Sequence, residues 1–167
     1  MKYSNINLGK DVEIDVSSSV NNVVIGDNVR IAKRCSVFGS PDNLLEIGSG
    51  CYVGMNSMLN GYAAKLTIGR NVSIAQNVSI MVDSGPNASE LMQNVFPIIR
   101  KPVRIGNHVW IGSGSIIMPG VSLGDFCIVA ANSYVNESFG PYTIIGGNPA
   151  KIIRSFTDEE KRKMEGM

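Results

Sequence analysis

A repeat of six residues limits the folds open to this chain more than any other feature. Between Ile105 and Val135 an aliphatic residue recurs at every sixth position, with no slip. Glycine or alanine often follows it, and a small apolar residue or serine stands four positions after it. A period of six fits neither an α-helix nor the alternation of a single strand. It predicts an all-β fold in which short strands and turns wind into stacked coils, a parallel β-helix.

The repeat begins near the N-terminus and falls into groups of three units, enough for one triangular coil each. Its aliphatic positions before Ile105 are Leu8, Ile14, Val20, Ile25, Ile31, Val37, Ile47, Val53, Leu59, Ile68, Ile74 and Ile80. The step from Val20 to Ile25 is one residue short. We therefore expect a shortened or distorted junction between the first two coils.

Three insertions interrupt the repeat. The short ones, at residues 39–43 and 61–64, contain turn-forming or small residues and predict corner loops. The long one covers about residues 81–104. A long excursion from a rigid scaffold often carries function, and the alternative is a surface loop that only packs against a neighbour. We expect residues of this segment to take part in the protein's activity.

The period is lost after Pro149. Residues 150–154 predict a short extended segment. Thr157 followed by Glu160 has the spacing of a helix capping box. Residues 158–165 are rich in helix formers, so a short C-terminal helix is expected there.

Stacked repeats need polar ends that close the core. The C-terminal helix is a candidate cover for the last coil, and residues 1–7 are a candidate cover for the first. The predicted organisation is one β-helix domain over residues 1–156, with its inserted loop, and a short helical tail over residues 157–167.

Each aliphatic residue is expected to point into its coil and to stack on its counterparts, where burying one such side chain contributes about 1.5–3 kcal/mol. The glycine that follows is expected to permit the sharp turn between faces. Cys35, Cys51 and Cys127 all stand four positions after an aliphatic residue, which indicates that they pack as small apolar side chains. A disulfide or metal site is the alternative, but the count is odd and the spacing fits no ligand pattern.

Composition narrows the classes of function. The 167 residues suit one domain, and a net charge of +1 gives no reason to expect a nucleic-acid partner. No apolar run is long enough to span a bilayer, and the first residues lack the apolar core of a signal peptide. We therefore expect a cytoplasmic protein with no membrane partner.

The repeats, with IGNHVWIG, IMPGVSLG and GGNPAKIIR among them, resemble the hexapeptide-repeat acyltransferases. The resemblance covers nearly the whole chain and is nearest to the sugar O-acetyltransferase branch. It implies a left-handed parallel β-helix, against the usual right-handed crossover preference. It also implies a homotrimer with active sites between subunits and with acetyl-CoA as the donor. The acceptor would be a hydroxyl or amine of a sugar, nucleotide sugar or polysaccharide precursor, and no metal is expected.

The resemblance implies a donor site at Trp110, Gly112, Ser113, Ala131, Asn136, Lys151 and Arg154. Backbone N–H groups near Ser113 and Ala131 would face the pantetheine arm and its thioester, and Trp110 would pack along the arm. Lys151 and Arg154 match basic positions near the adenosine phosphates, which arginine can bind through two nitrogens. The alternatives are a subunit contact for Trp110 and a solvated exit strand for the two cations.

The acceptor site departs from the resemblance, because relatives typically carry a catalytic histidine in the long loop and this loop has none. His108 is the chain's single histidine, and the repeat places it on the surface or in an interface, although a base role toward a neighbour's loop stays open. Asp83 is the other catalytic candidate, and as a base for an alcohol it would need burial. Asn60, Asn87 and Ser89 are expected to hydrogen-bond the acceptor. Turn architecture is the alternative for the loop residues.

Three other functions compete with acyl transfer. A catalytically weakened relative, acting as a scaffold or ligand-binding protein, would explain the missing loop histidine. A metal-dependent carbonic anhydrase on the same helix would need three histidine ligands, and the chain has one. A purely structural solenoid leaves the long loop unexplained. The sequence leaves open the acceptor, the choice between O- and N-acylation, and the length of the acyl chain.

Overall fold

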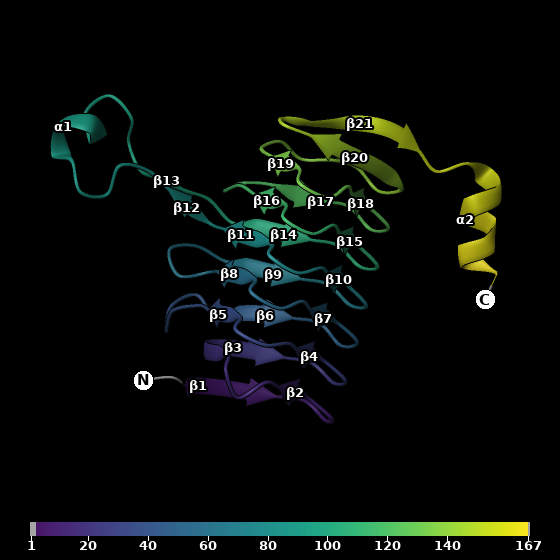
Figure 1. The fold of residues 1–167 in the computed structure, drawn as a ribbon, viewed down its shortest axis with the longest axis horizontal. Coiled ribbons are helices and arrows are strands. Elements are labelled where there is room, and N and C mark those ends of the chain that lie inside the picture. The colour runs from purple at the N-terminus through teal and green to yellow at the C-terminus, as the bar shows by residue number, and fades with distance from the viewer. Residues whose placement is uncertain (1–2, 167) are drawn as a thin grey trace.

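The six-residue repeat forms a left-handed parallel β-helix of about six turns (Figure 1). The computed structural model describes residues 3–166. Each turn has three faces, and the strands of one face pair in parallel with the strands directly above and below. The architecture predicted from the repeat is confirmed.

Each face is a column of short strands. The first face holds β6 (Leu45–Ile47), β9 (Leu66–Ile68), β14 (Val103–Ile105) and β17 (Ser122–Leu123). The second face holds β2 (Glu13–Ile14), β4 (Arg30–Ile31), β7 (Tyr52–Val53), β10 (Ser73–Ile74), β15 (Trp110–Ile111), β18 (Ile128–Val129) and β20 (Thr143–Gly147). The third face holds β5 (Ser36–Phe38), β8 (Met58–Asn60), β11 (Ser79–Met81), β16 (Ile116–Ile117) and β19 (Tyr134–Val135).

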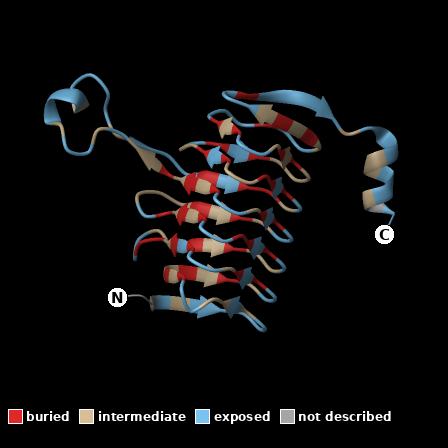
Figure 2. Ribbon diagram, viewed as in Figure 1, coloured by how far each residue is buried: buried red, intermediate tan, exposed pale blue. Residues whose placement is uncertain are grey.

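The aliphatic positions of the repeat point inward and stack in register. On the second face the stacked residues are Ile14, Ile31, Val53, Ile74, Ile111, Val129 and Ile145. All of them except Ile14, in the first turn, are buried, and Figure 2 shows buried and exposed residues alternating along the stacked strands. Cys35, Cys51 and Cys127 are buried free thiols, which confirms their packing role. Burial raises the pKa of the Cys35 and Cys51 thiols.

Most turns between faces contain one residue with a positive φ, three positions after the inward aliphatic residue. Asparagine fills this place most often, because its short polar side chain tolerates the left-handed region. The glycine directly after the aliphatic residue does not have a positive φ, so the prediction that it permits the turn is wrong. Its role is close stacking instead. A Cβ at Gly112 would lie 2.6 Å from the backbone nitrogen of Ala131 in the next turn.

All three insertions leave the helix at one edge, between the third and first faces, which we call the loop edge. The short insertions follow β5 and β8 and form corner loops, as predicted. The junction between the first two coils has no turn. Val20 and Ile25 belong to a single strand, β3 (Ser19–Ile25), which pairs with β5 at its start and with β6 at its end. β1 (Tyr3–Leu8) runs parallel to β3.

The long insertion forms an arm that projects from the loop edge (Figure 1). At its root β12 (Asp83–Ser84) and β13 (Ile99–Arg100) pair antiparallel, and α1 (Glu90–Gln93) lies near its tip. Most of the arm is exposed in Figure 2. Its exposed residues include the large apolar Leu91, Val95 and Phe96.

The C-terminal segment adds the last strand to the second face and then leaves the stack (Figure 1). β21 (Ala150–Ser155) folds back antiparallel on β20, and α2 (Asp158–Glu165) follows with the predicted capping box at Thr157 and Glu160. The prediction that this helix covers the last coil is wrong. α2 lies beside the last turns, because the extended β21 carries the chain past them before the helix begins (Figure 1).

At the other end of the stack, residues 3–7 belong to β1, which lies below β3 as the expected cover (Figure 1). Met1 and Lys2 lie outside the described residues. Neither α1 nor α2, the helices described within residues 3–166, has the length and apolar character needed to cross a bilayer.

Candidate functional site

Four of the seven predicted donor-site residues line one groove. It follows the edge between the second and third faces, which we call the groove edge, and encloses about 300 Å³. Its lining residues are Trp110, Gly112, Ser113 and Ala131, together with Ala75, Ile128, Val129 and Ala130. Trp110 projects from β15 with 54% of its surface exposed, so its indole is available as one wall of the groove. The structure therefore brings this part of the predicted site together.

Backbone N–H groups along this groove are open. The N–H groups of Ser113 and Ala131 have no hydrogen-bond partner within residues 3–166. They lie in successive turns, about 4.8 Å apart at the usual strand spacing. The equivalent N–H groups of Lys33, Met55 and Gln76 in the lower turns are open as well. The groove edge thus presents a ladder of unpaired amide donors.

The edge between the first and second faces differs in this respect. There a side-chain oxygen of the next turn accepts the equivalent N–H. The N–H of Lys10 donates to Asp27 at 2.7 Å, and the N–H of Asn107 donates to Asp125 at 2.8 Å. The backbone N–H and the side-chain amide of Asn107, together with the nearby Arg104 and His108, hold the pKa of the Asp125 carboxyl below its usual value. At the groove edge no side chain of the next turn accepts the N–H groups of the ladder, so these donors stay unpaired within residues 3–166.

Arg154, a predicted phosphate-binding residue, lies outside this groove but next to it. It lines a second hollow of about 280 Å³ that shares Ile128 with the donor groove. Both terminal nitrogens of Arg154 donate to the Glu160 carboxylate, each at 2.8 Å. This pairing lowers the pKa of Glu160 to about 2 and raises the pKa of Arg154. A phosphate at Arg154 would compete with Glu160.

The remaining predicted donor residues, Asn136 and Lys151, lie on the last turn. Lys151 projects from β21 and forms an ion pair with Glu137, the residue after Asn136. Asn136 is exposed at the end of β19. Both residues are absent from the lining of the donor groove, so a donor would have to extend along the C-terminal turns to reach them.

Two predicted acceptor-site residues meet at the root of the arm. The Asn60 side-chain amide donates to Asp83 Oδ1 at 2.9 Å. The Asn60 side-chain oxygen in turn accepts the backbone N–H of Tyr62 at 3.0 Å, which fixes the orientation of the amide. Asn60 and Asp83 are both half-buried.

Asn87 and Ser89 lie farther out on the arm and stabilise its tip. The Ser89 hydroxyl caps α1 by accepting the N–H of Met92 at 3.3 Å. The Asn87 carbonyl accepts the Gln93 side-chain amide, also at 3.3 Å. These contacts fit the architectural alternative for both residues, and the structure does not bring them to Asn60 and Asp83.

His108 is exposed at a different edge, between the first and second faces, as the repeat predicted. Its ring stacks on Phe126 with the ring centroids 4.8 Å apart and the planes nearly parallel, and Phe126 stacks on Tyr142 at 5.0 Å. The two predicted catalytic residues, His108 and Asp83, are therefore not brought together within one chain.

The donor groove and Asp83 lie on opposite edges of the third face. The chain crosses this face between Ser113 and Met118, a distance of roughly 16 Å at the usual rise per residue. A reacting thioester in the groove would not reach the Asp83 of the same chain across that distance.

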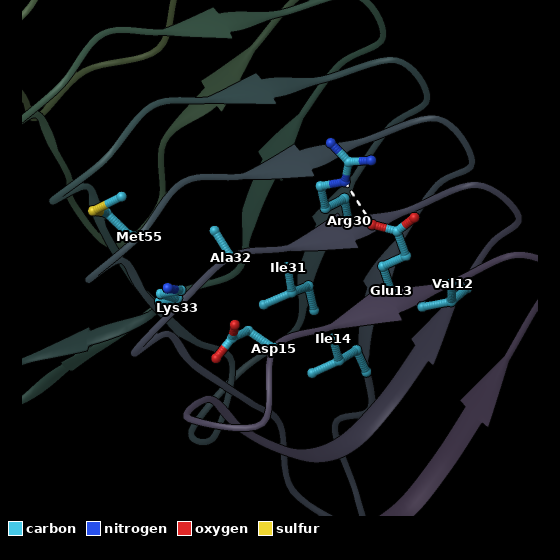
Figure 3. A pocket seen from close by; sticks show the side chains of 9 residues that line it. All are labelled: Val12, Glu13, Ile14, Asp15, Arg30, Ile31, Ala32, Lys33 and Met55. Atoms are coloured by element: carbon cyan, nitrogen blue, oxygen red, sulfur yellow. Dashed lines mark hydrogen bonds and ion pairs between the residues drawn. The ribbon is translucent and has the colours of Figure 1, made fainter.

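A larger hollow, of about 610 Å³, lies on the second face in the first turns (Figure 3). None of the predicted site residues lines it. Arg30 there donates to Glu13 at 2.8 Å, so these charges are already paired (Figure 3). The smaller groove differs from this hollow in combining open N–H donors with an exposed indole.

Sequence reasoning missed Ala75 and Ile128 as groove residues and the open N–H of Gln76 as part of the ladder. The repeat period contained a signal for the ladder. The residues two positions after the aliphatic are Lys10, Asp27, Ser49, Arg70, Asn107 and Asp125 on one edge, and Val16, Lys33, Met55, Gln76, Ser113 and Ala131 on the groove edge. The first set holds four short acceptors and the second holds one, Ser113, so fewer side chains on the groove edge can accept a backbone N–H.

Comparison with known proteins finds relatives that carry the same repeat. Residues 102–137 match the family model described as the hexapeptide repeat of succinyl-transferase. Galactoside O-acetyltransferase of Escherichia coli K12 is 35% identical over 138 residues, which cover 82% of this chain and 66% of that relative. The chain therefore spans just under two thirds of the relative's length.

Two solved structures share the fold. AntD, an N-acyltransferase from Bacillus cereus in complex with dTDP and 3-hydroxybutyryl-CoA, superposes with a TM-score of 0.80 at 27% identity, covering 95% of this chain and 85% of AntD. A galactoside acetyltransferase in complex with coenzyme A gives a TM-score of 0.62 at 28% identity, covering 93% and 68%. Together with the repeat and the groove, these matches show that the chain belongs to the hexapeptide-repeat acyltransferase family.

Proposed function

We propose that the protein transfers an acyl group, acetyl in the first instance, from acyl-CoA to a hydroxyl or amine of a sugar, nucleotide sugar or polysaccharide precursor. The observation that carries the proposal is the groove at Trp110, with the open N–H groups of Ser113 and Ala131. A pantetheine arm is a narrow chain with two amide carbonyls and a thioester carbonyl. Amide donors spaced along a groove match those acceptors.

The same donors suit the chemistry of acyl transfer. Negative charge develops on the thioester oxygen as the acceptor attacks, and preorganised backbone N–H groups stabilise such charge. Trp110 supplies an apolar wall for the arm. Arg154, beyond Ile128, supplies a cation for the phosphates once Glu160 is displaced.

We further propose that the working form is a homotrimer in the cytoplasm. One chain holds its donor groove and its Asp83 on opposite edges of a face, so a complete site needs the arm of a neighbouring copy beside the groove. The arm carries exposed apolar side chains at Val95, Phe96 and Ile99, which a neighbour would cover. Three buried free cysteines agree with a reducing compartment.

The single tryptophan of the chain makes donor binding directly measurable. Titrating acetyl-CoA into the protein should change Trp110 fluorescence in a saturable way, and calorimetry should give the same Kd. Arg154→Ala should weaken binding by about tenfold through loss of one charge-assisted contact. Release of CoA thiol in the presence of a sugar acceptor should follow. A folded protein that binds no acyl-CoA would refute the proposal and favour a scaffold role.

A further inference from the structure

The Asp83 carboxylate is fixed on one side and open on the other. Its Oδ1 accepts the Asn60 amide at 2.9 Å, and no other hydrogen bond of its side chain occurs within residues 3–166. The amide cannot turn freely, because its own oxygen holds the N–H of Tyr62. Asp83 is therefore a positioned, half-buried carboxylate with one oxygen available to a ligand.

This carboxylate also lacks a cation. Asp83 takes no part in the ion pairs formed within the described chain. Arg100 is its direct partner in the β12–β13 pairing, yet the Arg100 side chain stays exposed and forms no ion pair with it. An opposite charge stabilises a half-buried carboxylate, so the open oxygen of Asp83 favours a positively charged group of the substrate.

We propose that the acceptor is a primary amine of a sugar, which binds as its ammonium ion at Asp83. This inference rests on the proposed acyl transfer and names its acceptor class. A neutral sugar hydroxyl gains much less from an unpaired carboxylate than an ammonium does.

The chemistry of attack points the same way. A hydroxyl nucleophile needs a strong base in the transition state, and imidazole has a basicity matched to neutral pH whereas a carboxylate does not. The chain's single imidazole, on His108, is already engaged in stacking on Phe126. An amine nitrogen attacks through its own lone pair, so a carboxylate that orients the ammonium and accepts one proton from it is sufficient.

The proposed step balances as follows in atoms and charge. The bound ammonium loses one proton to Asp83, which passes it to solvent. The neutral nitrogen then attacks the thioester carbonyl carbon, the new C–N bond forms, and the C–S bond breaks. The second proton leaves the nitrogen and protonates the departing thiolate. An ammonium and acetyl-CoA thus give an amide, the CoA thiol and one proton.

Matched hexose pairs test the inference. Each pair carries an amine or a hydroxyl at the same ring carbon, and each is supplied free and linked to a nucleoside diphosphate. We expect kcat/KM for the amine member to exceed that of the hydroxyl member by at least about 100-fold. Asp83→Asn should lower amine transfer by about 100-fold or more while Trp110 fluorescence reports an unchanged Kd for acetyl-CoA. Ser84→Ala, the neighbouring change, should keep full activity.

A binding measurement removes the dependence on turnover. In the dead-end complex with CoA, calorimetry should detect the amino sugar with the wild type and not with Asp83→Asn. His108→Gln should keep amine transfer within a few-fold of wild type. Equal transfer to hydroxyl members, or loss of all transfer in His108→Gln, would overturn the amine inference and leave acyl transfer intact. Acetylation of no member by a protein that binds CoA would also count against it. Failure to bind CoA would instead refute the proposed function.

Discussion

Asn60 donates a 2.9 Å hydrogen bond to Asp83 and so joins the end of strand β8 to the root of the arm. The two residues are far apart in the sequence, and the stacking of one turn on the next brings them together. The bond fixes the direction of the carboxylate before any ligand arrives. Asn60 is in this sense a positioning residue for Asp83.

Replacing Asn60 tests that role. Asn60→Ala should lower kcat by about tenfold with a smaller change in KM, because the carboxylate stays present but loses its fixed direction. Asn60→Asp should be worse, since it places a second negative charge beside Asp83. Steady-state kinetics and a thermal melt separate this effect from misfolding. An Asn60→Ala enzyme with unchanged kcat would show that the hydrogen bond serves the loop alone.

Gly112 tests whether close stacking shapes the donor groove. A Cβ there would lie 2.6 Å from the Ala131 nitrogen, so Gly112→Ala must push two turns apart. We expect a loss of stability of about 1–3 kcal/mol together with weaker binding of acetyl-CoA. Gly140→Ala is the matched control, because a Cβ there meets nothing within 4 Å. Chemical denaturation of both variants checks the prediction, and equal stability would contradict it.

The inward aliphatic columns were predictable from the sequence because a fixed period forces stacking in register. Residues such as Ile74 and Ile111 occupy equivalent places in successive turns and pair directly. The donor groove was predictable for Trp110 and Ser113 through resemblance, since both lie in one strand-and-turn unit. The repeat period was enough to predict the columns, and the motif around Trp110 was enough to predict these groove residues.

Other features depend on contacts that the period does not encode. The bond between Asn60 and Asp83 crosses from a core strand to the arm, and the pairing of Arg154 with Glu160 depends on where the last helix begins. The position of α2 beside the stack follows from the length of β21. His108 was rightly expected at the surface. Its stacking on Phe126 follows because both residues stand three positions after the aliphatic residue in successive turns. The prediction did not compare these equivalent positions.

The arm offers a test of assembly. Phe96→Ser removes a large exposed apolar side chain at the arm's tip, so a trimer held by this contact should dissociate at low concentration. Sedimentation velocity should then report a smaller species, and transfer activity should fall with it because the site is divided between copies. Phe96→Leu keeps an apolar side chain and should keep both. A Phe96→Ser protein of unchanged mass and activity would place the contact elsewhere.

The pairing of Glu160 with Arg154 predicts a pH-dependent tail. The Glu160 pKa is lowered from 4.5 to about 2 in the folded chain, so the folded state holds this proton less tightly than the unfolded state. The stabilisation is therefore complete above pH 4.5, declines as the pH falls toward 2, and is absent below that. An NMR titration of the Glu160 carboxyl should give a midpoint near 2. A midpoint near 4.5 would show that the pair does not form in solution.

The same pair predicts the effect of freeing Arg154. Glu160→Gln removes the competing charge yet keeps the capping box, since glutamine also serves at the third helical position of that motif. If Arg154 binds the donor's phosphates, the Kd for acetyl-CoA should fall by roughly two- to fivefold at low salt. Glu159→Gln is the matched control. It removes the same charge from α2, but Glu159 pairs with Lys163 and not with Arg154. Fluorescence of Trp110 measures both variants. Equal tightening in the two would indicate only a general charge effect, and weaker binding in Glu160→Gln would argue that Arg154 holds the helix and not the donor.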